Sequence, residues 1–189
     1  EAAKILKESG ADLLVLEMLL DIDHSKILLN AALETGLPVW VGLSCCDSKF
    51  DNSVIGRNFR AEKEKSLIYD ENMFKDQPKY LPEDKIILLE DIIKSLTSLG
   101  GDVYGIMHTW FQDSIGGLTT LKNNWKGPIM FYPEIHKFDT NTHKAIITMT
   151  EEEFSNSILE LIDDQIQIVG GCCGVNDKHL KRLIQSISE

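Results

Sequence analysis

Two adjacent cysteines, Cys172 and Cys173, stand between glycines at the end of an apolar run, in the stretch Gly170–Gly174. Neighbouring Cα atoms lie about 3.8 Å apart across a trans peptide, whereas an unstrained disulfide needs roughly 4.4 to 6.8 Å. The pair therefore suits a metal ion better than a disulfide. Successive side chains of a strand point to opposite faces, so both sulfurs can face one point only on irregular backbone, which glycines allow. The alternative is a pair of buried structural cysteines, because a free cysteine packs as a small hydrophobe.

Strand-like apolar runs alternate with helical patterns along the chain, which is typical of βα units and a parallel sheet. We expect strands at 12–16, 39–44, 103–107, 128–132 and 166–169, and helices at 1–9, 25–35, 85–99, 115–124, 150–163 and 177–186. Thr150 and Glu153 are spaced as a capping box at the start of the fifth helix. The sequence therefore predicts an α/β fold of five strand–helix units.

The segment from Ile166 to Leu183 resembles the closing signature of the homocysteine S-methyltransferase family, which includes betaine-, S-methylmethionine- and methylfolate-dependent enzymes. The resemblance implies a (β/α)8 TIM barrel, of which this chain would hold about strands 4 to 8 with their helices. Residues 1–189 would be the C-terminal portion of a single homocysteine-binding barrel domain. Such barrels take about 250 residues or more, and the chain opens in a helical pattern without an N-cap or initiator methionine. We therefore expect a fragment that lacks roughly three βα units.

The same resemblance implies a Zn²⁺ site. In the family, the double cysteine supplies two of three zinc ligands, and a cysteine in the pattern Gly-x-Asn-Cys-Thr supplies the third. Here Met107 and His108 stand in place of that asparagine and cysteine. Cys₂His sites with an open position are known catalytic zinc arrangements, so the implied ligands are Cys172, Cys173 and His108. The alternative is that His108 only hydrogen-bonds within the barrel mouth.

Glu17 matches the family glutamate that holds the amino group of homocysteine; the alternative is a glutamate paired with a structural cation. Two other positions depart from the family, since Glu134 replaces an asparagine and Gly42 stands where relatives often carry serine. The implied activity is zinc-dependent methyl transfer to the thiol of homocysteine, giving methionine, with no catalytic group beyond the metal site. The departures leave two alternatives: a barrel that binds zinc or a thiol without catalysis, as an inactive paralogue or sensor, and a structural fragment without metal.

Other polar features are given simpler interpretations. Cys45 and Cys46 lack flanking glycines, so we expect their sulfurs to point to opposite faces and to serve in packing, with either one an outside candidate for a metal ligand. We expect His136 and His143 to be solvated in a polar loop. The polar stretch 47–83 is predicted to be a long βα loop insertion, either a lid or substrate loop or a tolerated surface insertion.

The bulk composition limits the partners. Of the 189 residues, 43% are hydrophobic and 26% charged, as in an ordinary globular domain. The net charge of −11 repels phosphate, so neither nucleic acid nor an anionic membrane surface is expected as a partner. The most apolar window, 13–20, is far shorter than a bilayer span, and nothing reads as a signal peptide. Two vicinal cysteine pairs then predict a reducing, cytoplasmic setting, with homocysteine and a methyl donor as the implied small-molecule partners.

Overall fold

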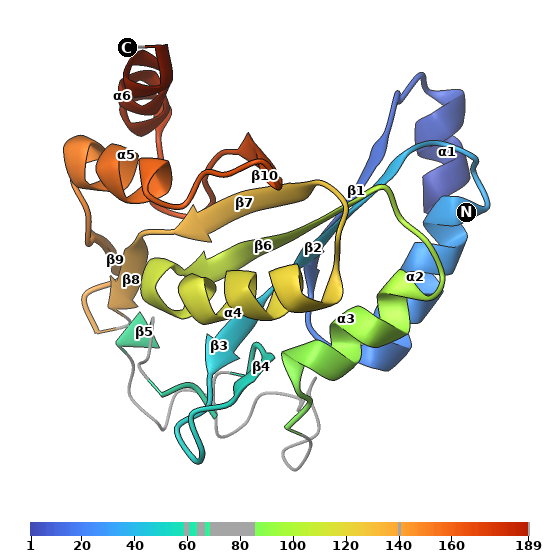
Figure 1. Cartoon of the computed structure of the whole chain (residues 1–189), viewed down its shortest axis with the longest axis horizontal. Coiled ribbons are helices and arrows are strands. Elements are labelled where there is room, and N and C mark those ends of the chain that lie inside the picture. Colours follow the sequence, from blue (N-terminus) through green and yellow to red (C-terminus); the bar gives the residue numbers. More distant parts are fainter. Residues whose placement is uncertain (59–60, 64–66, 69–85, 140, 189) are drawn as a thin grey trace.

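Five parallel strands form the centre of the molecule. The computed structural model describes residues 1–58, 61–63, 67–68, 86–139 and 141–188 (Figure 1). The strands are β1 (Leu14–Leu19), β2 (Val39–Leu43), β6 (Val103–Trp110), β7 (Ile129–Glu134) and β10 (Ile166–Val169). Each lies beside the next one along the chain, and every pairing is parallel. The predicted α/β class, with strands in the sequential order of part of a (β/α)8 barrel, is therefore confirmed.

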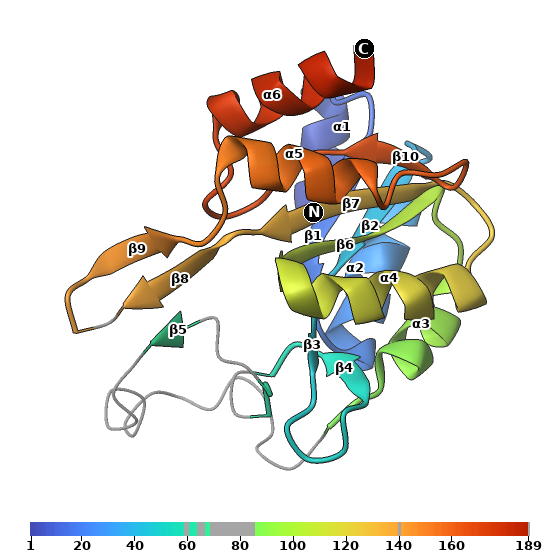
Figure 2. The same cartoon turned by 60° about the vertical axis from the view of Figure 1, so that its left-hand side comes forward.

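In the described ranges, six helices accompany these strands. They are α1 (Ala2–Glu8), α2 (Ile22–Leu33), α3 (Leu89–Thr97), α4 (Phe111–Asn124), α5 (Glu151–Leu159) and α6 (Asp177–Ser188). Helices α2, α3 and α4 contact one another in a row along the sheet, whereas α5 packs against α6 (Figure 2). The predicted capping box of α5 is present, because Glu153 N donates to Thr150 Oγ1 and Thr150 N donates to Glu153 Oε2. A helix thus follows each of the five strands, as the sequence pattern predicts, directly after β1, β6 and β10 and after short β elements in the case of β2 and β7.

Short β elements occupy stretches that the sequence predicts as loops. β3 (Cys45–Asp47) and β4 (Val54–Gly56) form an antiparallel pair, as do β8 (His136–Asp139) and β9 (Lys144–Ile147), and β5 (Leu67–Ile68) pairs with β8. Of the stretch predicted as a long loop at 47–83, positions 59–60, 64–66 and 69–83 lie outside the described residues. Alternation in strands of three or four residues is too brief to be recognised from sequence alone.

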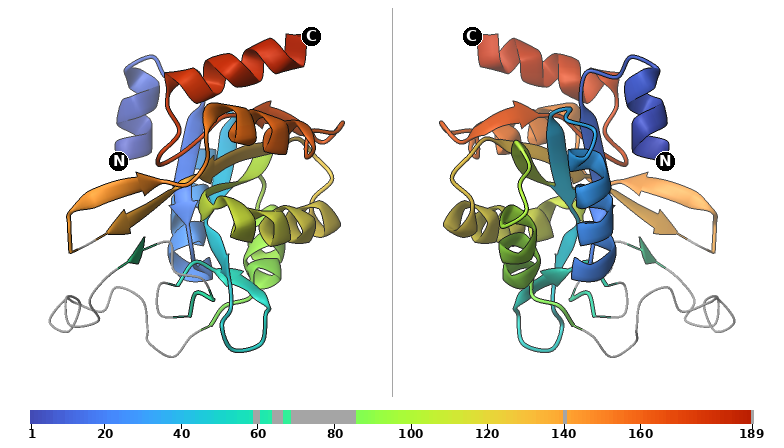
Figure 3. Two further views of the ribbon diagram at one scale, coloured as in Figure 1. Left: turned by 90° about the vertical axis from the view of Figure 1, so that its left-hand side faces the viewer. Right: turned by 90° about the vertical axis from the view of Figure 1, so that its right-hand side faces the viewer.

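The sheet has an open edge on each side (Figure 3). Within the described residues, β1 pairs only with β2, and β10 pairs only with β7. Large apolar side chains are exposed on β1 and on the helices that follow the two edge strands, namely Val15, Met18, Ile27, Leu28, Ile184 and Ile187. In the described part of the chain, no helix has both the length and the apolar character that crossing a membrane requires.

The core lies between the sheet and the row of helices. Leu29 of α2, Ile92 of α3 and Leu121 of α4 are fully buried together with strand residues such as Val41. Burying an aliphatic side chain of this size contributes about 1.5 to 3 kcal/mol. This packing holds the strands in register and so fixes where their carboxyl ends lie.

Candidate metal centre

The carboxyl ends of β6, β7 and β10 are adjacent in the sheet and carry the candidate ligands. His108 lies near the end of β6, and Glu134 is the last residue of β7. Cys172 and Cys173 follow β10 directly. The three strands therefore bring together side chains that are up to 65 positions apart in the sequence.

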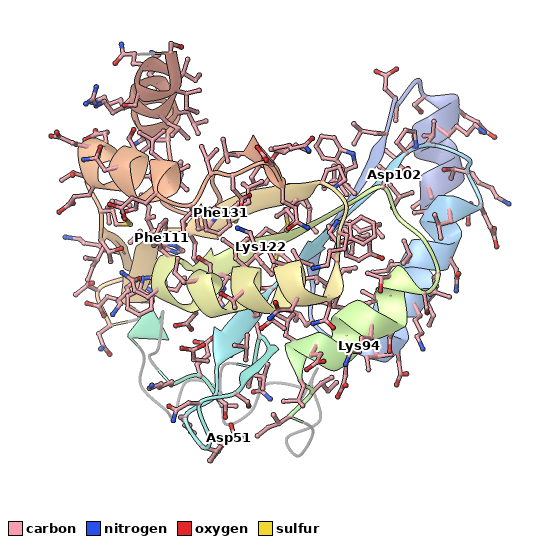
Figure 4. All side chains as sticks on the ribbon, viewed as in Figure 1. Asp51, Lys94, Asp102, Phe111, Lys122 and Phe131 are labelled. Atoms are coloured by element: carbon pink, nitrogen blue, oxygen red, sulfur yellow. The ribbon has the colours of Figure 1, made fainter. Side chains whose placement is uncertain are left out.

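Two aromatic rings anchor the ends of β6 and β7. Phe111, which begins α4, and Phe131 of β7 belong to the central core, and their ring centroids lie 6.1 Å apart in an edge-to-face arrangement (Figure 4). Such pairs contribute about 0.5 to 1.5 kcal/mol beyond their buried area. The strand ends that carry His108 and Glu134 therefore rest on a packed apolar base.

Three of the four predicted site residues are in contact. His108 Nδ1 lies 3.6 Å from Cys172 Sγ and 3.8 Å from Cys173 Sγ, and the two sulfurs are 3.8 Å apart without a disulfide. With Zn–S near 2.3 Å and Zn–N near 2.0 to 2.1 Å, tetrahedral coordination separates two sulfurs by about 3.8 Å and a sulfur and a nitrogen by about 3.6 Å. The donor set and its spacing therefore fit three corners of a zinc site.

An unusual backbone conformation orients His108. Its φ is +46°, in the left-handed region that non-glycine residues rarely adopt. The β6–β7 register shifts between Met107 and Trp110, so the strand is irregular at this point. The main-chain oxygen of His108 accepts a hydrogen bond from Ser44 Oγ at 2.6 Å and another from Arg57 Nη1. These two donors hold the carbonyl on one side while the ring turns toward the cysteines.

Main-chain hydrogen bonds place the two cysteines against the end of β7. Cys172 N donates to Pro133 O at 3.0 Å, and Ile135 N donates to Cys173 O at 2.9 Å. Gly174 has a φ of +89°, a conformation that a side chain would strain. The chain can therefore turn immediately after the second cysteine.

The glycines before the cysteines have a different role from the one we predicted. Gly170 and Gly171 do not have positive φ values. A Cβ at Gly170 would lie 2.7 Å from the ring of Tyr132, and one at Gly171 would lie 2.3 Å from Val175. These positions therefore require glycine for space, and only Gly174 requires it for backbone freedom.

Burial dominates the electrostatics of the candidate ligands. Desolvation lowers the pKa of His108, although the Glu134 carboxylate opposes this effect. The imidazole is therefore neutral at neutral pH, which is the form that binds a metal. Burial, followed by the neighbouring Cys172, raises the pKa of Cys173. Metal binding must therefore release thiol protons at this site.

Glu17, the fourth predicted site residue, lies in β1 at the opposite end of the five-strand order. Its side chain is exposed. Its charge contributes to raising the pKa of Tyr132 on β7 and opposes the lowering of the His108 pKa. The carboxylate therefore acts electrostatically on the side of the sheet that carries the candidate ligands, and it belongs to no cluster of possible metal ligands within the described residues.

A buried charged cluster that sequence reasoning missed borders the ligands. Arg57 Nε donates to Glu62 Oε1 at 2.8 Å, and Arg57 Nη2 donates to Glu134 Oε1 at 2.7 Å. The other oxygen of Glu134, Oε2, lies 3.4 Å from His108 Nδ1. Glu134 was recognisable as a departure from the family pattern, but nothing in the single sequence marked Arg57 or Glu62.

The second cysteine pair has the packing role that we predicted. Cys45 lies in the main core and Cys46 in a separate small cluster with Ile55 and Ala61, so the sulfurs face different sides. Burial raises the pKa of Cys45, and it raises that of Cys46 to about 12. Neither belongs to a cluster of possible metal ligands among the described residues.

The prediction for His136 is wrong, whereas that for His143 is confirmed. His136 opens β8 and is only half-exposed, and its Nδ1 is buried without a hydrogen bond in the described part of the chain. Its ring nitrogen also lies within 4.8 Å of ligand atoms of Glu134 and Cys173. His143 is exposed at the turn of the β8–β9 hairpin. The residues around His136 are polar, so the sequence did not indicate the short strand β8 beside the site.

Comparisons with known proteins agree with this architecture. A family model described as homocysteine S-methyltransferase matches residues 88–187. No curated protein matches the chain. The homocysteine methyltransferase MmuM from Escherichia coli is similar in fold, with a TM-score of 0.61 at 14% identity for its metallated form and 0.60 at 15% for its apo form. Dihydrodipicolinate synthase DapA-2 from Bacillus anthracis is similar at a TM-score of 0.56 and 11% identity.

The matches differ in how much of each protein they include. Both MmuM structures align with 96% of this chain, and DapA-2 aligns with 97% of it. The chain spans only 47% of metallated MmuM, 52% of apo MmuM and 51% of DapA-2. The chain thus has about half the length of these barrel enzymes. Because the family model covers more than half of its residues, this chain belongs to the homocysteine S-methyltransferase family.

Proposed function

We propose that the complete protein transfers a methyl group to the thiol of homocysteine in a zinc-dependent reaction and so forms methionine. This chain would be the C-terminal portion of a single homocysteine-binding barrel domain. The main support is the spacing of His108 Nδ1 and the sulfurs of Cys172 and Cys173, found in a chain of the homocysteine S-methyltransferase family.

Cys172, Cys173 and His108 would hold the zinc ion and leave one tetrahedral position for the substrate sulfur. Zinc bound there would supply the charge that keeps a thiol deprotonated and therefore nucleophilic. The lowered pKa of His108 keeps its imidazole neutral and ready to coordinate. The three side chains would thus orient the reacting sulfur.

Glu17 would bind the ammonium group of homocysteine. Its exposed carboxylate acts electrostatically on His108 and Tyr132, which supports a position facing the same space. In the reaction, a bond forms between the substrate sulfur and the methyl carbon while the bond from that carbon to the donor breaks. The thiol proton passes to solvent.

Metal analysis of the complete protein tests the site. We expect about one Zn²⁺ per chain, lost in Cys172→Ser and in Cys173→Ser. Cys45→Ala is the matched control, because Cys45 is a buried thiol outside the ligand cluster, and it should keep its zinc. Full zinc content in both serine variants would contradict the proposal.

Methionine formation tests the reaction. We expect the complete protein to form methionine from homocysteine and one donor among a quaternary ammonium, a sulfonium and a methylfolate, and to lose this activity with its zinc. Binding of zinc and homocysteine without methionine from any donor would instead favour a non-catalytic thiol-binding barrel.

A further inference from the structure

A buried charged pair lies beside the candidate ligands. The side chains of Arg57 and Glu134 are only 4% and 1% exposed, and Arg57 Nη2 lies 2.7 Å from Glu134 Oε1. Glu62, equally buried, accepts from Arg57 Nε at 2.8 Å. Burying charges costs free energy that their mutual attraction often fails to recover. Stability alone is therefore a weak reason for this cluster.

The second oxygen of Glu134 points to the ligands. Oε2 is buried and makes no hydrogen bond within the described part of the chain, and it lies 3.4 Å from His108 Nδ1. A buried acceptor without a donor is costly, the more so when it is charged. A cation held by the neighbouring ligands would compensate this oxygen.

Arg57 fixes the arrangement at two points. By binding Oε1 of Glu134 it leaves Oε2 directed at His108 Nδ1. Its Nη1 donates to the main-chain oxygen of His108, which also accepts from Ser44 Oγ. The strained φ of +46° at His108 persists only where surrounding contacts enforce it. One planar guanidinium therefore holds both the third ligand and the carboxylate beside it.

We propose that Arg57 is a positioning residue of the metal centre and that the Glu134 carboxylate it holds supplies negative charge beside the bound ion. The inference rests on the three-ligand centre of the proposed function and assigns two residues beyond it. It also makes Arg57 and Glu62 part of the surroundings of the site.

The experiment measures Zn²⁺ affinity of the complete protein by competition with a chromophoric chelator, together with the absorption spectrum of the Co²⁺-substituted protein. Arg57→Lys keeps the positive charge but loses the planar fork, so it tests orientation without changing repulsion of the ion. We expect about 10- to 100-fold weaker Zn²⁺ binding and a shifted Co²⁺ d–d band. Arg182→Lys on α6 is the matched control and should change neither.

Glu134→Gln removes the charge and keeps the shape of the side chain. We expect about 10-fold weaker Zn²⁺ binding. Because Arg57 acts partly through Glu134, the loss in the double variant should be smaller than the product of the single losses. Thermal unfolding of the metal-free variants separates a positioning role from a structural one. A substitution with only a structural effect lowers Tm but leaves the Co²⁺ spectrum unchanged.

Wild-type zinc affinity and an unchanged Co²⁺ spectrum in folded Arg57→Lys and Glu134→Gln would overturn the inference, as would losses that simply multiply. Should Arg57→Lys fail to fold, Ser44→Ala replaces it, because it removes the other donor to the His108 carbonyl and should also weaken zinc binding. A wild-type protein that binds zinc but forms no methionine contradicts only the proposed function. A wild-type protein without zinc contradicts both.

Discussion

At position 108, where the family pattern has a cysteine thiolate, the imidazole of His108 would be a neutral ligand in the proposed site. With Zn²⁺ and a substrate thiolate, two cysteine thiolates and an imidazole give a formal charge of −1, whereas three cysteine thiolates give −2. Glu134, which stands in place of an asparagine, would return one negative charge to that site, because its Oε2 lies 3.4 Å from His108 Nδ1. This charge lies beside the ligands and is shared with Arg57, so it offsets the difference only in part.

We predict that His108→Cys raises the rate of methyl transfer in the complete protein. A more negative ligand set holds the substrate sulfur less tightly and leaves it more nucleophilic. The measurement is single-turnover methionine formation at saturating homocysteine, with zinc content determined in parallel. A variant that binds zinc equally and turns over no faster would refute the prediction.

Gly42 and Met107, two further departures from the family pattern, are neighbours in space. A Cβ at Gly42 would lie 2.4 Å from Met107 Sδ, and Met107 is 3% exposed. The methionine side chain therefore fills the space that a serine at position 42 would need. The two departures therefore depend on each other, because the glycine leaves the space that the methionine side chain occupies.

We predict that Gly42→Ala destabilises the complete protein by about 1 to 3 kcal/mol through overpacking. In the double variant Gly42→Ala/Met107→Ala, the new methyl group partly fills the cavity left by the methionine. The double variant should therefore lose less free energy of unfolding than the sum of the single variants. Urea unfolding of all four proteins measures the coupling, and strict additivity would show that the residues do not compete for space.

At the level of elements, helix α4 begins with a carboxyl group that links it to β3. Asp113 is 5% exposed, and its Oδ2 accepts from Asp47 N at 3.4 Å. Burial, and then the Asp47 carboxylate, raise the pKa of Asp113 from 3.8 to about 7. The folded protein therefore retains this proton at pH values where the unfolded chain has lost it.

This raised pKa predicts a pH-dependent stability. Between about pH 4 and pH 7 the folded state binds more protons than the unfolded state, so the free energy of unfolding falls as the pH rises. The stabilisation is complete below about pH 4 and is lost as the pH passes the folded pKa. Asp113→Asn, which keeps the acceptor oxygen, should remove this slope when urea unfolding is followed from pH 4 to 8. Parallel profiles for the variant and the wild type would contradict the assignment.

The sequence patterns correctly predicted the strands and helices of the repeated βα units. All five strands of the sheet coincide with apolar runs, although β1 is shifted to Leu14–Leu19 and therefore contains Glu17. β6 extends to Trp110, so His108 lies within the strand and not after it. Strand ends depend on pairing with neighbours, which a local pattern does not record.

The site could be predicted only in part for the same reason. The double cysteine is visible because its residues are adjacent, and His108 was found through the family pattern. Arg57 contacts a carboxylate 77 positions away, and such a contact leaves no periodicity in the sequence. From sequence alone, an arginine in a polar stretch is predicted to be exposed, because only the fold shows the carboxylates that pair with it when it is buried.

At the scale of the whole molecule, β1 and β10 are the edge strands of the sheet, and each pairs on one side only within the described residues. In the described part of the chain, each edge has a side without a neighbouring strand, and such an edge is a template for pairing with another chain. Exposed apolar side chains on the adjoining helices, such as Ile27 and Ile184, also favour association with another chain. An eight-stranded barrel would cover both edges with three further units.

We predict that residues 1–189 expressed alone self-associate. Val15→Lys on the β1 edge should reduce the association, because an edge lysine opposes strand pairing, whereas Lys122→Arg, a surface change on α4, should not. Light scattering after size-exclusion chromatography gives the mass of each species. A monomeric chain with cooperative unfolding would show that the edges are tolerated.

The candidate ligands come from β6 and from the segment after the edge strand β10, with only β7 between them, and β1 at the other edge contributes none of the three. An ion could therefore bind at the proposed site before any further strand pairs with β1 or β10.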